Sequence, residues 1–201
     1  LTVHGEGFVM TRAFQRGTTV TAIALGEAHP CAHCRQFLSE FAATRDMVLI
    51  DPLGHRLTMA DLYPWPFDPG YLGQTGAVPG TVTFPDLHAG PMTPVLLLET
   101  GQRAYAPYSH CPGAIVLDLA DGSQVAGAAI ESVAFNPTIQ PLQSALVALF
   151  AAALTFFEYA STYPGLVEFR DAPPFNRLRF LSLFATVLLL SAIVRGQTEP
   201  T

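Results

Sequence analysis

A small group of residues near the start of the chain has the types and spacing of a catalytic metal site. His4 is followed two residues later by Glu6, and Cys31 and Cys34 form a Cys-x-x-Cys pair directly after Pro30. One imidazole and two thiolates supply three ligands for Zn²⁺ and leave the fourth tetrahedral position open, as in catalytic zinc sites. The Glu6 carboxylate could reach the same cavity without binding the metal and accept a proton there.

Two helices are expected to carry these ligands. Residues 4–16 have the apolar spacing of a short helix, and Pro30 is typical of the first turn of another. The ligands then lie at two helix N-termini. The partial positive charge at such a terminus favours a thiolate, so we expect the pKa of Cys31 and Cys34 to be lowered.

The surrounding pattern predicts an α/β protein. Residues 18–25 are β-branched and apolar, as in a strand buried on both faces, and residues 47–50 form another short buried strand. Helices and strands therefore alternate, which indicates an α/β layered domain. Proline and glycine recur through residues 63–94 and exclude long regular elements, so this segment is interpreted as a linker.

A second ordered region follows the linker. Residues 114–118 and 125–130 flank an Asp-Gly turn and predict a β-hairpin, and residues 142–157 predict an apolar helix. Residues 180–194 are uncharged, but this run is shorter than the ~20 residues that span a bilayer. A buried element is the preferred interpretation of this run, and a membrane segment is the alternative.

The composition narrows the possible functions. Only 13% of the 201 residues are charged and 50% are hydrophobic, which excludes a disordered protein. The formal net charge of -6 argues against a nucleic-acid polymer as partner. Two of the three cysteines lie in one Cys-x-x-Cys pair, which indicates a reducing compartment and hence the cytoplasm (cytosol). The first residue is Leu1, and we expect the chain to be an N-terminally truncated fragment.

Several stretches of the chain together resemble one enzyme family. His-x-Glu followed by Pro-Cys-x-x-Cys is the signature of zinc deaminases. The wider pattern resembles the dimeric, duplicated-domain type of zinc-dependent cytidine deaminase. The similar stretches are residues 2–6, 30–40 and 62–72 for the catalytic domain, and residues 106–109, 135–138 and 141–146 for the C-terminal domain.

The resemblance implies a three-layer cytidine-deaminase-like fold built from a partial catalytic domain and a degenerate second copy. The implied boundaries are residues 1–62 for the zinc-binding domain, 63–100 for the linker and 101–201 for the second copy. In that copy Gln140 stands where the first has His4, and Leu142 stands where it has Glu6. The second copy is therefore expected to be structural, and the protein to be a homodimer.

The resemblance also implies roles for individual residues in the deamination of cytidine or deoxycytidine by a zinc-activated water, a step of pyrimidine salvage. Glu6 would be the proton shuttle. The backbone N–H of Gly5 and the carbonyl of His29 would contact the base, and Arg35 would offset the charge of a thiolate. The metal ligands would be His4, Cys31 and Cys34.

Two departures from the family pattern leave other functions open. Gly5 replaces the usual alanine, and the family's nucleoside-binding Asn and Glu fall upstream of Leu1; the second copy keeps only Glu131, with Ala129 at the Asn position. A non-catalytic pseudo-deaminase that serves as a dimerisation module is therefore the main alternative. A redox Cys-x-x-Cys pair and a structural zinc site, for which His33 is a poor fourth ligand, are the others.

Overall fold

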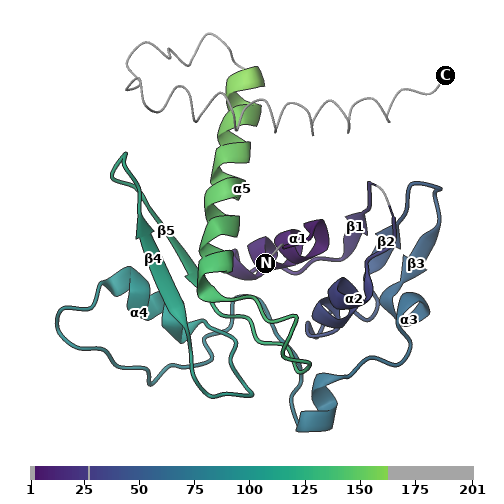
Figure 1. Ribbon diagram of the computed structural model, residues 1–201, viewed down its shortest axis with the longest axis horizontal. Coiled ribbons are helices and arrows are strands. Elements are labelled where there is room, and N and C mark those ends of the chain that lie inside the picture. Colours follow the sequence, from purple (N-terminus) through teal and green to yellow (C-terminus); the bar gives the residue numbers. More distant parts are fainter. Residues whose placement is uncertain (1–2, 27, 163–201) are drawn as a thin grey trace. The chain divides into compact units, whose positions relative to one another are not determined.

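The computed structural model describes residues 3–26 and 28–162, with side chains up to residue 153. Helices and strands alternate along the first part of the chain, and a hairpin and a long helix follow (Figure 1). The elements are α1 (Gly5–Gln15), β1 (Ala22–Ala24), α2 (Ala32–Leu38), β2 (Val48–Ile50), β3 (Arg56–Thr58), α3 (Met59–Leu62), the 3₁₀ helix η1 (Pro69–Leu72), α4 (Val95–Gln102), β4 (Ala114–Asp118), β5 (Gln124–Ala128) and α5 (Pro141–Thr162).

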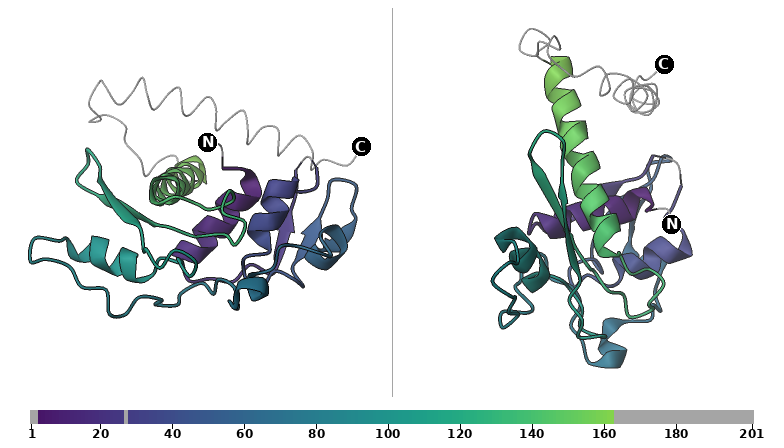
Figure 2. Two further views of the ribbon diagram at one scale, coloured as in Figure 1. Left: turned by 60° about the horizontal axis from the view of Figure 1, so that its bottom comes forward. Right: turned by 60° about the vertical axis from the view of Figure 1, so that its left-hand side comes forward.

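A three-stranded sheet in the order β1-β2-β3 organises the first part. β1 and β2 are parallel and are joined through α2, whereas β3 returns antiparallel to β2. Helices α1 and α2 lie side by side in both views of Figure 2. The α/β class and the predicted helix–strand–helix–strand order are confirmed. The parallel pairing matters for function because it brings the carboxyl ends of β1 and β2 to the same edge.

One continuous core holds these elements together. Its members are large apolar side chains on the facing surfaces of the helices and the sheet, and burying each contributes roughly 1.5–3 kcal/mol. They include Met10, Phe14, Ile23, Phe37, Leu38, Phe41, Met47, Leu49 and Met59, together with Tyr105, Ile130 and Ile139 from later in the chain. The core is therefore shared between segments that are far apart in sequence.

The strand predicted over residues 18–25 was wrong in length and burial. β1 comprises only Ala22–Ala24, and of these only Ile23 is buried. β1 is an edge strand of its sheet, paired on one side with β2. Among the described residues, β1 therefore has no neighbouring strand on one side, and only one of its faces is buried. The β-branched residues before Ala22 do not extend the strand.

The second predicted region agrees with the structure. β4 and β5 pair antiparallel around the Asp121-Gly122 turn, α4 packs on this hairpin, and α5 includes the predicted helix over residues 142–157. The hairpin approaches the first turns of α5 very closely at Gly127. A Cβ there would overlap the backbone of Pro141 and Ala145, so only glycine fits.

The proline- and glycine-rich segment forms no long element, as predicted. Among its described residues η1 is the one short helix, and an isolated bridge joins Phe41 to Ala77. Residues 1–150 form one compact unit. The expected boundaries at residues 62 and 100 stay predictions. No helix in the described part of the chain is long and apolar enough to cross a membrane, and the run 180–194 lies outside that part.

A buried carboxylate joins early and late segments of the first unit. Glu40 is fully buried. Its Oε1 accepts hydrogen bonds from the hydroxyls of Tyr105 and Tyr108, and its Oε2 accepts one from the backbone N–H of Val133 at 2.8 Å. Burial raises the pKa of the Glu40 carboxyl, and these hydrogen bonds offset part of that effect. Three donors therefore depend on one acceptor.

Candidate metal centre

The three expected ligands lie at the N-termini of two adjacent helices. His4 is the N-cap of α1 and Cys31 is the N-cap of α2; their carbonyls accept the first helical hydrogen bonds, from Phe8 and Arg35. Neither side chain caps its own helix, so the imidazole and the thiol are available elsewhere. Cys34, one turn into α2, is 3% exposed and completes the group.

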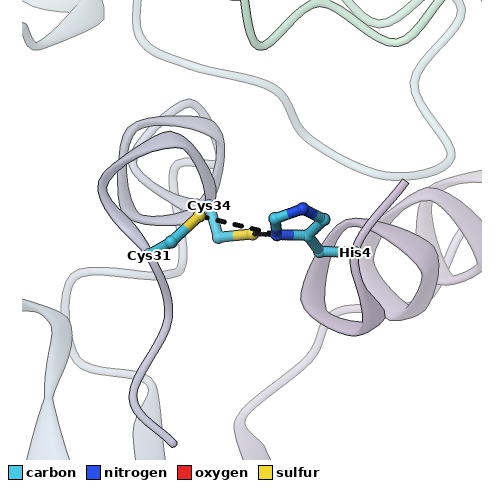
Figure 3. A group of neighbouring side chains, drawn as sticks. All are labelled: His4, Cys31 and Cys34. Atoms are coloured by element: carbon cyan, nitrogen blue, oxygen red, sulfur yellow. Dashed lines mark hydrogen bonds between the residues drawn. The ribbon is translucent and has the colours of Figure 1, made fainter. Parts of the chain in front are cut away.

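The three donor atoms converge on one point (Figure 3). His4 Nδ1 lies 3.5 Å from Cys31 Sγ and 3.4 Å from Cys34 Sγ. Zn–N bonds of about 2.0–2.1 Å and Zn–S bonds of about 2.3 Å at tetrahedral angles put N and S about 3.5 Å apart. The spacing of these donors therefore fits a zinc ion with an open fourth position.

Glu6 lies beside the donors without joining them. Its Oε2 is 3.5 Å from Cys34 Sγ, which donates to it. Burial, followed by the nearby Glu6 carboxylate, raises the pKa of the Cys34 thiol. The pKa of this thiol is therefore raised, and the expectation that the helix terminus lowers it is wrong. A bound metal reverses this balance, since a coordinating thiol is deprotonated.

The other three predicted site residues occupy different positions around this group. Gly5 is the first residue of α1, next to His4. The His29 ring contacts Asp51, with its Nε2 2.9 Å from Asp51 Oδ2. Arg35 donates from Nε to the Pro30 carbonyl at 2.7 Å and from Nη1 to a second carbonyl, that of Leu62. Arg35 thus binds backbone carbonyls rather than a thiolate and braces the segment before Cys31.

A cavity of about 250 Å³ adjoins the metal-binding group. His4, Cys34 and Phe37 line one side, and residues 135–140 and Gln143 line the other. The size is just below the ~300–1,000 Å³ of drug-sized ligand sites, which suits a smaller ligand. A second cavity, of about 130 Å³ beside Thr44, contains none of these ligands.

Two features near the site were not predicted from the sequence as site residues. Residues 135–138 were noted only as part of the C-terminal resemblance, yet they line the cavity. Asp51 was not singled out, and it gathers His29 and His55 around one carboxylate. The similarity of residues 135–138 was a usable signal for the first, whereas the second depends on strand pairing and has no spacing motif.

Comparison with known proteins finds similarity to deaminases. Residues 94–172 match the family model for the cytidine and deoxycytidylate deaminase zinc-binding region, a segment that does not contain His4, Cys31 or Cys34. The cytidine deaminase of Aliivibrio fischeri is 32% identical over 148 residues, covering 73% of this chain and 50% of that protein. The chain is therefore similar to this cytidine deaminase over most of its own length.

Other cytidine deaminases align over similar lengths. That of Shewanella amazonensis is 32% identical over 149 residues, with 73% of this chain and 50% of that protein covered. That of Salmonella paratyphi B is 31% identical over 159 residues, with 79% and 53% covered. The chain spans about half the length of these cytidine deaminases. The family model and the donor set together support Zn²⁺ as the metal.

Gly5, next to His4, allows a test of how the backbone freedom of α1 affects the stability of the fold. A Cβ at Gly5 meets nothing within 4 Å. We expect Gly5→Ala to stabilise the fold by up to about 1 kcal/mol, because glycine loses more backbone entropy than alanine on entering a helix. Thermal unfolding followed by circular dichroism measures this change, and zinc content should stay the same.

Gly7→Ala is the matched control on the same helix. A Cβ at Gly7 would lie 3.3 Å from Val3 Cγ1, so its benefit should be smaller or absent. Loss of zinc or of stability in Gly5→Ala would show that position 5 needs glycine for a reason other than helix geometry.

Proposed function

We propose that this chain carries the zinc centre of a cytidine deaminase, which hydrolyses cytidine or deoxycytidine to uridine or deoxyuridine and ammonia. The observation that carries the proposal is the convergence of His4, Cys31 and Cys34 with the Glu6 carboxylate beside them. Three ligands with an open fourth position are the arrangement of a catalytic zinc site, and the donors and their spacing fit it.

Each residue near the centre would have a distinct part in this reaction. When bound by His4, Cys31 and Cys34, zinc supplies Lewis acidity that makes water nucleophilic near neutral pH. Glu6 would accept a proton from the water that attacks C4 of the base, protonate ring N3 and pass a second proton to the departing amine. The C4–N bond then breaks, oxygen replaces the amine, and ammonia leaves.

The backbone around the centre would orient the base. We propose that the carbonyl of His29 accepts from the exocyclic amine and that the N–H of Gly5 contacts the ring. The His29 ring is turned to Asp51 and is therefore not needed for this contact. Arg35 would act as a positioning residue, since it holds the carbonyl of Pro30, directly before Cys31, at 2.7 Å.

The later part of the chain is proposed to be a degenerate second copy that has no chemistry of its own. The family model matches residues 94–172, where no Cys-x-x-Cys pair occurs. Gln140 and Leu142 stand in place of a ligand and a proton shuttle, and leucine cannot carry a proton. We propose that this part supports a homodimer, and that the enzyme serves pyrimidine salvage in the cytosol.

Replacing Glu6 with glutamine tests the proposed chemistry. The amide cannot accept the proton, so we expect the rate of ammonia release from cytidine to fall by roughly 10²–10⁴-fold. Zinc content should be unchanged, because Glu6 is not one of the three ligands. Ammonia release and metal analysis on the same sample measure both effects, and Glu99→Gln, an exposed glutamate on α4, is the control.

The outcomes separate the enzyme from the alternative. Deamination that continues undiminished in Glu6→Gln removes Glu6 from the mechanism. A wild-type chain that binds zinc and releases no ammonia supports a non-catalytic dimerisation module instead.

A further inference from the structure

A second convergent group lies at the carboxyl ends of the parallel strands. Asp51 directly follows β2, His55 directly precedes β3, and His29 lies on the segment that follows β1. Because β1 and β2 run parallel, their carboxyl ends meet at one edge, a common place for ligands in α/β sheets. The turn between β2 and β3 brings His55 back to the same edge.

The Asp51 side chain is held in a fixed orientation at this edge. It is 5% exposed, and its Oδ1 accepts hydrogen bonds from the backbone N–H groups of Leu53 at 3.0 Å and His55 at 2.8 Å. Its Oδ2 faces two rings, with His29 Nε2 at 2.9 Å and His55 Nδ1 at 2.7 Å. The backbone therefore preorganises the carboxylate and leaves one oxygen to the imidazoles.

We propose that His29, Asp51 and His55 bind a divalent first-row transition-metal ion, at a site separate from the zinc centre. The three ligand atoms lie within 4.8 Å of one another. Bonds of about 2.1 Å at right angles put neighbouring donors about 3.0 Å apart, close to the two separations from Oδ2. Two imidazoles and one carboxylate form a set that leaves further positions of the metal open.

Charge and access favour a cation at this edge. The Asp51 carboxylate places a negatively charged oxygen, Oδ2, between the two imidazoles. The His29 and His55 side chains are 37% and 59% exposed, so an ion can enter from solvent and the rings can adjust.

The chemistry of the donors distinguishes this site from the zinc centre. It contains nitrogen and oxygen donors only, whereas the zinc centre has two sulfurs, which select Zn²⁺ more strongly. Imidazole-rich sites accept Ni²⁺, and Ni²⁺ binds most N/O sites more tightly than Co²⁺ or Fe²⁺. Nickel is therefore a suitable probe for the second site.

Nickel binding to the untagged 201-residue chain tests the proposal. In a Cys31→Ser/Cys34→Ser background, which removes the thiolates, isothermal titration should show one equivalent of Ni²⁺. Adding His55→Ala should weaken binding by roughly a hundredfold or more, since even an outer partner of a metal ligand contributes 10–100-fold. His88→Ala, an exposed histidine elsewhere in the described chain, should leave binding unchanged.

A second measurement covers the case in which the serine variant does not fold. The wild-type chain dialysed against excess Zn²⁺ should hold two equivalents, and His55→Ala and Asp51→Asn should each hold one, with circular dichroism confirming their fold. Equal amounts of bound Zn²⁺ in the wild type and in His55→Ala would overturn the proposal and leave a hydrogen-bonded triad. Because the second site is measured as the difference between these two chains, the result does not depend on whether the His4–Cys31–Cys34 group binds zinc or supports deamination.

Discussion

Replacing Cys34 with serine should strip zinc from the chain. The thiol is 3% exposed and 3.4 Å from His4 Nδ1, so its sulfur is one of the three converging donors. A serine hydroxyl at the same place is a much poorer zinc ligand than a thiolate. We expect the affinity for Zn²⁺ to fall by roughly a thousandfold or more, beyond the 10–100-fold lost with an outer partner of a ligand.

Competition with a chromophoric chelator measures this affinity, and the chain supplies its own control. Cys111 is an exposed cysteine outside the group, so Cys111→Ser should bind zinc as the wild type does. Equal affinity in Cys34→Ser and the wild type would mean that the zinc is held elsewhere. Both measurements are repeated in chains that also carry His55→Ala, so that zinc bound at the His29–Asp51–His55 group does not contribute to the comparison.

Replacing Glu40 with glutamine should destabilise the fold by about 1–3 kcal/mol. The carboxylate accepts from two tyrosine hydroxyls and the Val133 N–H inside the core. Glutamine has one acceptor oxygen, and its NH₂ group would face at least one of these donors. A buried donor left without an acceptor costs about 1–3 kcal/mol. Glu40→Gln should therefore destabilise the fold more than a substitution at an exposed position does.

Urea unfolding followed by circular dichroism measures the free energy of unfolding. Tyr105→Phe removes one donor and leaves the carboxylate in place, so it should cost only about 1–2 kcal/mol. Glu99→Gln makes the same chemical change on the exposed surface of α4 and should have almost no effect. A Glu40→Gln protein as stable as the wild type would show that the buried hydrogen bonds contribute little.

The zinc centre could be predicted from the sequence because its information is local. His4 with Glu6, and Cys31 with Cys34, are each set by spacing along one helix terminus, and Pro30 marks where the second helix begins. Both helix starts were predicted close to their observed positions. Spacing within a helix turn fixes which side chains share a face, so local sequence was sufficient here.

The remaining features depend on long-range pairing that no spacing reveals. The length of β1 is limited by its place at the sheet edge, which residues 18–25 do not encode. The group of His29, Asp51 and His55 follows from the register of β2 with its neighbours. The sequence identified Glu40 only as part of the stretch that resembles the family. Its hydrogen-bond partners could not be predicted, because they lie 65 and more positions away in sequence.

The position of His4 and Cys31 as N-caps has a consequence for how metal is acquired. Both helices pack through an apolar core that contains neither residue, so the positions of the two N-caps are set by this packing. Small zinc domains without such a core are instead unfolded when apo. In this chain the scaffold that holds the two N-caps consists of apolar contacts rather than of metal–ligand bonds.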